Sequence, residues 1–220
     1  MTYTTLVFIH VMLLVFWLGT DLGVFLAAKR SERSDLGVET RSALLGLGMV
    51  LDRLPRSCLT LIVPTGLQMA VNMGLIAVSA WILPSLWLIA AVWLVVLWTG
   101  FLNPGSRFEK PSMLINFALN ALMALIFTPV GIYLLVKGGV PGWLAVKVLI
   151  IGAIFCTGVV LDLLFKPAIE AFTAILAEGA SPERDAAYSR AIGPVYKAVL
   201  AIYALVAIAA YLGIAKPPFA

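Results

Sequence analysis

Long apolar stretches separated by shorter polar segments run through the whole chain, and they predict its secondary structure. A helix that crosses a bilayer needs about 20 mostly apolar residues. Six stretches reach this length: residues 3–28, 57–78, 81–102, 113–136, 143–165 and 192–214. The pattern therefore predicts an all-α fold, a polytopic membrane helical bundle with six transmembrane helices. We expect residues 1–220 to form a single transmembrane domain.

Two of the polar segments also show helical patterns. In residues 36–54 the apolar positions recur at helical spacing, at Leu44, Leu47, Val50, Leu51 and Leu54. Residues 181–190 begin with Ser181, Pro182 and Glu183, which is typical of an N-cap, a first-turn proline and an acidic first turn. We expect both segments to be amphipathic helices at the membrane surface.

Short motifs suggest an internal repeat. The first, third and fifth stretches contain W-L-G at 17–19, W-T-G at 98–100 and C-T-G at 156–158. The second and fourth stretches contain V-P-T-G at 63–66 and T-P-V-G at 128–131. Because the first two pairs of stretches have the same order of motifs and the fifth stretch repeats the motif of the first and third, the sequence predicts three hairpin repeats.

Composition supports the membrane assignment and excludes other classes. The chain is 62% hydrophobic and 12% charged, whereas soluble domains are about half apolar and a quarter charged. Its net charge is +4, but no basic run with interleaved aromatic residues indicates nucleic-acid binding. The expected partner is thus the lipid bilayer, with no nucleic acid. Cys58 and Cys156 both lie in apolar runs, so we expect no disulfide framework.

Basic residues predict the orientation in the membrane. Most of the 15 lysines and arginines lie in the segments that follow the first, third and fifth stretches. The positive-inside rule places these segments in the cytoplasm and both termini outside. The first stretch has no basic segment before it, so we expect a retained helix rather than a signal peptide. The predicted location is the cell membrane, as a multi-pass protein of the bacterial inner membrane.

Ionisable groups inside apolar helices are costly and mark candidate sites. His10, the only histidine, lies about 10 Å below the outer edge of the first stretch, from a rise of about 1.5 Å per residue. Lys147 has a similar predicted depth. Gln68, Met69, Asn72 and Met73 fall in the outer half of the second stretch. These residues form a predicted outer group.

A second polar group falls nearer the inner face. Its members are Asp21, Asn116, Asn120, Asp162 and Lys197. Pairing of Asp21 or Asp162 with Lys197 would let buried charges neutralise each other. The group has two interpretations, which the sequence leaves open: polar contacts that join helices, or a proton path to the inner side.

The chemistry of His10 also has alternatives. A neutral imidazole can bind haem iron or another metal, or it can form a hydrogen bond in the core. One histidine cannot build a tetrahedral zinc site. Haem would be five-coordinate, or six-coordinate with Met69 or Met73, and Lys147 would meet a propionate. Phe8, Phe16, Trp17 and Trp143 would wall the porphyrin. Methionine sulfur with His10 would instead suit Cu(I).

Two motifs resemble a known family. F-I-H-V-M-L-L-V-F-W-L-G, residues 8–19, has a histidine, six apolar residues, a tryptophan and then a glycine. It resembles the first helix of the HemJ-type protoporphyrinogen oxidases and the wider CopD-like group of membrane proteins. P-G-W-L-A-V-K-V-L-I, residues 141–150, resembles the opening of a later helix of that family. The resemblance stops after Gly19, where the family's aromatic, positively charged continuation is replaced.

The resemblance implies a function and a set of residues. It implies that His10 is the metal ligand of a haem b, that Trp17 and Trp143 occupy family positions, and that Lys147 assists near the haem as the catalytic candidate. The expected function is a haem-dependent membrane oxidoreductase, with a redox partner or a second copy of the chain. Two alternatives remain: a CopD-like copper or small-solute transporter, and a structural subunit of a larger membrane complex.

Overall fold

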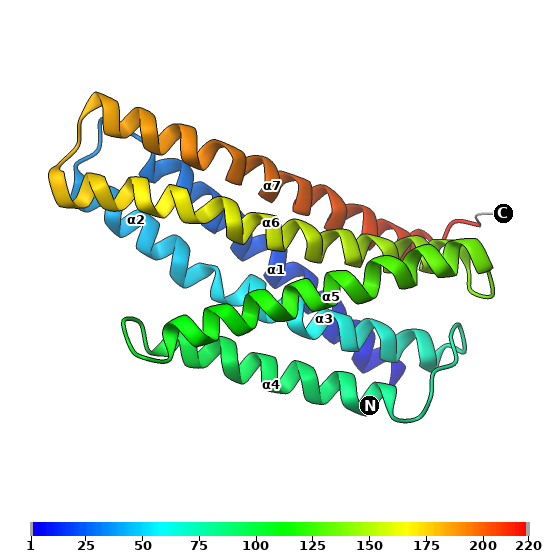
Figure 1. Cartoon of the computed structure of the whole chain (residues 1–220). Helices are drawn as coiled ribbons and strands as arrows, with labels where there is room; N and C mark the ends of the chain where they lie inside the picture. The colour runs from blue at the N-terminus through cyan, green and yellow to red at the C-terminus, as the bar shows by residue number, and fades with distance from the viewer. Residues whose placement is uncertain (1, 219–220) are drawn as a thin grey trace. The chain divides into compact units, whose positions relative to one another are not determined.

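The computed structural model describes residues 2–218, which form helices joined by turns and loops, with no strand in that range. The seven helices are α1 (Tyr3–Ser31), α2 (Val38–Leu51), α3 (Arg53–Asn72), α4 (Ile82–Leu102), α5 (Glu109–Lys137), α6 (Gly142–Glu178) and α7 (Pro182–Ala215) (Figure 1). The predicted all-α bundle is confirmed.

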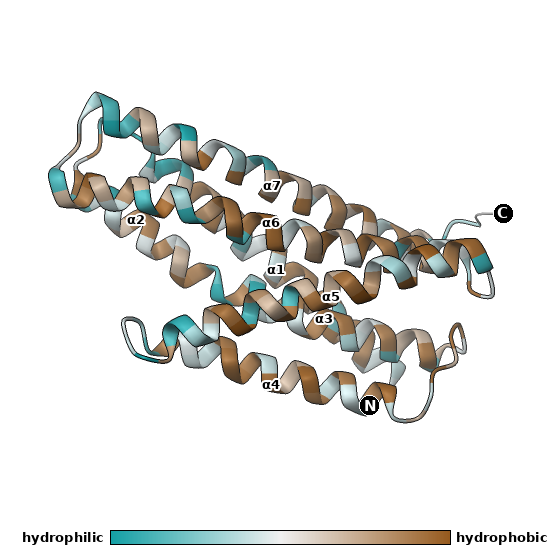
Figure 2. Ribbon diagram, viewed as in Figure 1, coloured by the Kyte–Doolittle hydropathy of each residue, from teal (hydrophilic) through white to brown (hydrophobic). Residues whose placement is uncertain are grey.

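Five of these helices are long and apolar enough to cross a membrane: α1, α4, α5, α6 and α7. Figure 2 shows them apolar over most of their length, with polar residues gathered near the loop that joins α6 to α7. The chain is an integral membrane protein on this basis. The sequence predicted six spans. Within residues 2–218, the second of them, residues 57–78, corresponds to α3, which is not among the five helices that are long and apolar enough.

The physical reason for that difference lies in the composition and the end of α3. The helix begins with two arginines, Arg53 and Arg56, and also carries serine, threonine, glutamine and asparagine side chains. It ends at Asn72, and Gly74 then adopts a left-handed conformation with φ of 68°. Residues 75–78, which are apolar and were expected to extend the span to 78, therefore lie outside the helix.

Two further boundaries differ from the sequence-based expectation. Helix α6 continues past Phe165, through Pro167, and ends only before Gly179, whose φ is 84°. Residues 181–190 are not a separate surface helix, because α7 runs unbroken from Pro182 through Pro194 to Ala215. The predicted N-cap is confirmed, since the Ser181 hydroxyl accepts a hydrogen bond from the Arg184 backbone N–H at 3.3 Å.

The chain forms two compact units. Unit 1 comprises Met1–Gly23 and Val50–Leu119, and unit 2 comprises Val24–Met49 and Asn120–Ala220. In unit 1, α3 packs against α4, and the Trp98 indole donates to the Ser57 hydroxyl at 3.2 Å. In unit 2, α6 and α7 run antiparallel side by side (Figure 1). The predicted three-hairpin repeat stays a prediction.

Glycines bring α5 and α6 together in unit 2. A Cβ atom on Gly152 would lie 2.6 Å from the Thr128 backbone nitrogen, and one on Gly131 would lie 2.5 Å from the Leu149 Cα. Both glycines belong to apolar helices in which backbones can approach only where a side chain is missing. The glycine of the T-P-V-G motif at 128–131 thus has a packing role.

Candidate functional site

His10 lies on the face of α1 that turns toward the interior of unit 1. Leu6, His10 and Trp17 share this face, because their spacings of four and seven residues return to nearly the same angle on a helix. Leu6 and Trp17 are buried, His10 is half-buried, and Phe8 on the opposite side is 63% exposed. The predicted His10–Trp17 pair is therefore on one face, with Trp17 in the core.

Thr65 of α3 holds the imidazole of His10. The His10 Nδ1 lies 2.9 Å from the Thr65 Oγ1. The same Oγ1 lies 2.9 Å from the Leu61 carbonyl oxygen and 3.0 Å from the Ile62 carbonyl oxygen. A hydroxyl has only one proton to donate. At these distances from two carbonyl oxygens, the Thr65 hydroxyl directs that proton toward the helix backbone, as threonine commonly does in a helix.

The direction of these bonds decides the tautomer of His10. If the Thr65 hydroxyl donated to Nδ1, its lone pairs would face two carbonyl oxygens, which is repulsive. Because the hydroxyl donates to the backbone, its oxygen accepts, and Nδ1 of His10 carries the proton. In the neutral ring, Nε2 then carries the lone pair. Nε2 is therefore the atom that would bind a metal in this tautomer.

The V-P-T-G segment of α3 makes room for the ring. A Cβ atom on Gly66 would lie 3.2 Å from the His10 Cε1, so the imidazole lies against bare backbone at this residue. Pro64 lies inside the helix, where its missing N–H leaves the Thr60 carbonyl without a helical donor. Proline, threonine and glycine in succession therefore supply a local irregularity, a hydrogen-bond acceptor and a gap.

Met69 and Met73 follow Thr65 along the same helix. Residues four apart lie on one face of a helix, so Met69 is one turn beyond Thr65 and Met73 is two turns beyond. Met69 is half-buried, whereas Met73 is 38% exposed at the end of α3. Gln68 donates to the Asn72 side chain at 3.0 Å. Of the two sulfur atoms, Met69 is nearer the His10 contact along α3.

Lys147 and Trp143 belong to unit 2, on the first two turns of α6, and both are half-buried. The ammonium nitrogen of Lys147 lies 2.5 Å from the position that a Cβ atom would take on Gly213 of α7. The missing side chain at Gly213 thus gives the ammonium group its place. Joining Lys147 and Trp143 to the residues of unit 1 in one site stays a prediction.

The inner polar group has separate partners. Asp21 lies in unit 1, where the charged groups that act on it are Asp52 and Arg56, which form an ion pair at 2.6 Å. The Trp93 indole donates to the buried Asn116 side chain at 3.0 Å. Lys197 is exposed on α7 in unit 2. Asn116 is therefore a helix-joining contact, one of the two roles that the sequence left open.

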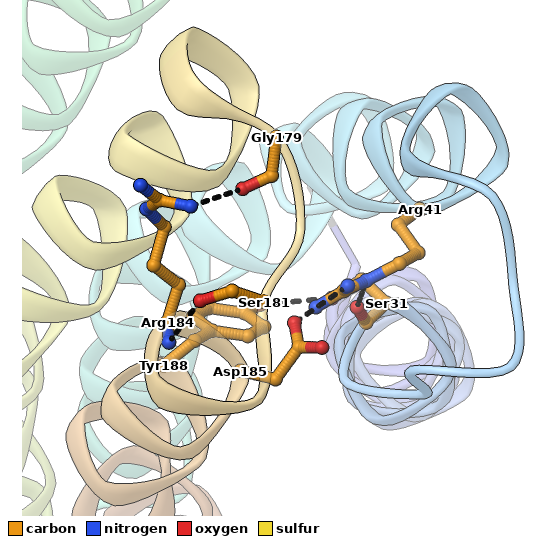
Figure 3. A network of polar contacts seen from close by, with 7 residues as sticks. All are labelled: Ser31, Arg41, Gly179, Ser181, Arg184, Asp185 and Tyr188. Atoms are coloured by element: carbon orange, nitrogen blue, oxygen red, sulfur yellow. Dashed lines mark hydrogen bonds and ion pairs between the residues drawn. The ribbon is translucent and has the colours of Figure 1, made fainter.

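A second polar cluster lies in unit 2 (Figure 3). The Arg41 side chain is 0% exposed, its Nε donates to the Ser31 carbonyl at 2.8 Å, and its Nη1 pairs with Asp185 at 2.8 Å. The Tyr188 hydroxyl lies 2.8 Å from the Ser31 hydroxyl, which itself donates to the Ala28 carbonyl. The cluster connects α1, α2 and α7 at one end of the unit.

Sequence reasoning missed Thr65 and Arg41. Thr65 lies 55 residues from His10, and nothing in the sequence joins them, although the V-P-T-G motif marked the segment. Arg41 was one of many loop cations, and its partner Asp185 is 144 residues away. The only sequence signal for Arg41 is its spacing along the helix. Arg41 lies four residues before Leu45 and seven before Gly48, so the three share the buried face of α2.

Comparison of the chain with family models, curated proteins and solved structures finds no match. The residues themselves limit the metal chemistry. Within residues 2–218, no group of three or more His, Cys, Asp or Glu side chains is placed to hold a metal ion. A metal held at His10 would therefore need donors from a cofactor, or methionine sulfur from Met69 or Met73.

Proposed function

We propose that this protein is a haem b-binding membrane redox protein in which His10 is a ligand of the iron. The observation that supports the proposal is the 2.9 Å contact between His10 Nδ1 and Thr65 Oγ1. Because the Thr65 hydroxyl donates to helical carbonyls, Nδ1 would be the donor in this contact and the lone pair would be on Nε2. Histidines that bind metals commonly donate their other N–H to an acceptor in this way. The porphyrin would supply the four donors that nearby side chains do not.

The remaining predicted residues have assigned roles in this proposal. Met69, one turn from Thr65 on α3, is the candidate second axial ligand, with Met73 as the alternative. Trp17 lines the same face of α1 as His10. Lys147, one turn after Trp143 on α6, keeps the role of catalytic candidate that the family resemblance implies. When bound, haem supplies one-electron chemistry, and the helices control its ligation, burial and access.

The first test is the visible spectrum of the protein purified in mild detergent, both oxidised and reduced. We expect a Soret band in the wild type that disappears in His10→Ala. Phe8→Ala is the matched control: the sequence suggested that Phe8 lines a porphyrin, but it is 63% exposed on the side of α1 opposite His10, and Phe16 is 51% exposed, so neither is part of the proposed site. The control should keep the band, because its side chain does not face the interior of unit 1.

A wild type that is colourless even after expression with added haem precursor would overturn the proposal. Copper measured on the same samples tests the alternative ligand set. Stoichiometric copper that is lost in both His10→Ala and Met69→Leu, without a Soret band, would replace haem by a Cu(I) site and favour the transporter function. A wild type with neither a Soret band nor bound copper would favour the third function, a structural subunit of a larger membrane complex.

A further inference from the structure

We propose that Thr65 is the positioning residue of the His10 site: it holds the imidazole in the Nδ1–H tautomer and fixes the direction of Nε2. The inference deepens the proposed function and rests on it for the identity of the ligand, haem iron. The orientation of the ring can be measured without any ligand. Thr65 would thus act on the iron through His10 rather than by touching it.

The first argument is that Thr65 is itself held rigidly. Its side chain is 1% exposed, and the hydroxyl is anchored to the carbonyls of Leu61 and Ile62 one turn earlier in α3. Threonine is β-branched, so its χ1 has few alternatives within a helix. The acceptor that His10 meets therefore has a fixed position and a fixed direction.

The second argument concerns the ring plane. Nδ1 is held by Thr65, and the adjacent ring atom Cε1 lies against Gly66, 3.2 Å from the position of its missing Cβ atom. One contact fixes a point of the ring and the other limits its rotation. With both in place, Nε2, which follows Cε1 around the ring, has a defined direction.

The third argument concerns the strength of the ligand. An acceptor on Nδ1–H increases the electron density of the imidazole, and removal of such partners typically weakens metal binding by about 10- to 100-fold. The Thr65 oxygen is a better acceptor when its own proton is donated to a carbonyl, because hydrogen bonds in a chain polarise one another. The chain here runs from His10 through Thr65 to the α3 backbone.

The experiment uses the fact that His10 is the only histidine. Labelling the full chain with 15N-histidine gives ring signals from one residue, which are recorded on haem-free protein in detergent at a pH where the ring is neutral. We expect protonated Nδ1 and unprotonated Nε2 in the wild type. Thr65→Val, which replaces the hydroxyl by a methyl group of similar size, should shift the tautomer, whereas Thr65→Ser, which keeps a hydroxyl, should retain the wild-type tautomer.

The matched control is Thr60→Val. Thr60 is also buried on α3, and its hydroxyl also donates to a backbone carbonyl, that of Arg56 at 3.0 Å. The Thr60→Val variant should leave the 15N signals of the His10 ring unchanged. Haem titrated into the same proteins should bind Thr65→Val about 10- to 100-fold more weakly than Thr60→Val. Gly66→Ala, which keeps the hydroxyl but displaces the ring, should also weaken binding.

An Nε2–H tautomer in the wild type would overturn the inference, and so would a Thr65→Val variant indistinguishable from Thr60→Val in both measurements. The two proposals fail separately. If the wild type binds no haem but its Nδ1–H tautomer depends on Thr65, the positioning role of Thr65 is supported and the haem function is refuted.

Discussion

The polar contacts of the two units differ in charge and in place. In unit 1, the side chains that meet between helices are uncharged: His10 with Thr65, Trp93 with Asn116, and Trp98 with Ser57. Its Asp52–Arg56 ion pair joins residues four apart in the chain and does not link two helices. In unit 2, α2 and α7 are joined by an ion pair between the buried Arg41 and Asp185, near the ends of α1 and α7. An uncharged contact costs little to bury, whereas a buried charge requires a partner of opposite sign. We therefore expect the units to respond differently to loss of one partner.

The largest expected effect is that of Arg41→Met. The change leaves the Asp185 carboxylate without its 2.8 Å partner and should destabilise unit 2 by about 3–5 kcal/mol. Unfolding in detergent measures it. Arg33→Met is the control, since Arg33 pairs with Asp35 in solvent, and it should have no measurable effect. Partial recovery of stability in Arg41→Met with Asp185→Leu would confirm the charge argument; equal losses from Arg33→Met and Arg41→Met would contradict it.

A smaller effect is expected from Asn116→Leu in unit 1. The Trp93 indole N–H loses its acceptor at 3.0 Å between α4 and α5. The cost should be about 1–2 kcal/mol, because interhelical hydrogen bonds between neutral groups contribute modestly. The same unfolding assay measures it, with Asn103→Leu as an exposed control. A loss as large as that of Arg41→Met would erase the distinction between the units.

Tyr188→Phe removes a neutral bond from the charged cluster itself. The Ser31 hydroxyl then loses the Tyr188 hydroxyl at 2.8 Å but keeps its bond to the Ala28 carbonyl. We expect a loss of about 0.5–1.5 kcal/mol, well below that of Arg41→Met. A larger loss would mean that the hydroxyls, rather than the ion pair, hold the cluster together.

The smallest effect concerns pH. Burial alone would raise the pKa of the Glu32 carboxyl, but hydrogen bonds from Ser189, Lys29 and Tyr196 outweigh it and lower the pKa. A carboxyl with a lowered folded-state pKa stabilises the fold above its unfolded pKa, and this contribution is lost as the pH falls through the folded value. The unfolding midpoint of Glu32→Gln should therefore converge with that of the wild type in acid. A constant difference at every pH would exclude the assignment.

The sequence pattern predicts the presence of each helix more accurately than the residues at which the helix begins and ends. The apolar runs predicted α1, α4 and α5 to within a few residues, because a bilayer allows few alternatives to a continuous helix. The same reasoning stopped α6 at Phe165, where the apolar run meets Lys166, and separated residues 181–190, which are more polar than the apolar run after them. Pro167 and Pro194 are tolerated here because their neighbours Ala168, Ile192 and Val195 are buried in one apolar cluster of unit 2.

The candidate site was predictable only in part. His10 was identified because a lone histidine in an apolar helix is unusual. Its tautomer depends on the direction of the Thr65 hydroxyl, which is set by the helical carbonyls of α3 and has no signature in the sequence. The burial of Arg41 likewise depends on Asp185, a long-range contact that charge counting along a loop cannot predict.

The length of α6 has a consequence for experiments on the intact membrane. Its 37 residues extend about 55 Å at 1.5 Å per residue, whereas the hydrocarbon layer is about 30 Å thick. The helix is thus longer than the hydrocarbon layer that it crosses, so part of it must lie outside that layer or the helix must tilt strongly. We expect its last turns, which carry the charged residues Lys166, Glu170 and Glu178, to be the end that projects into water, together with the charged start of α7. Water-soluble labels and proteases should reach this tip while the lipid still shields the rest of the hairpin.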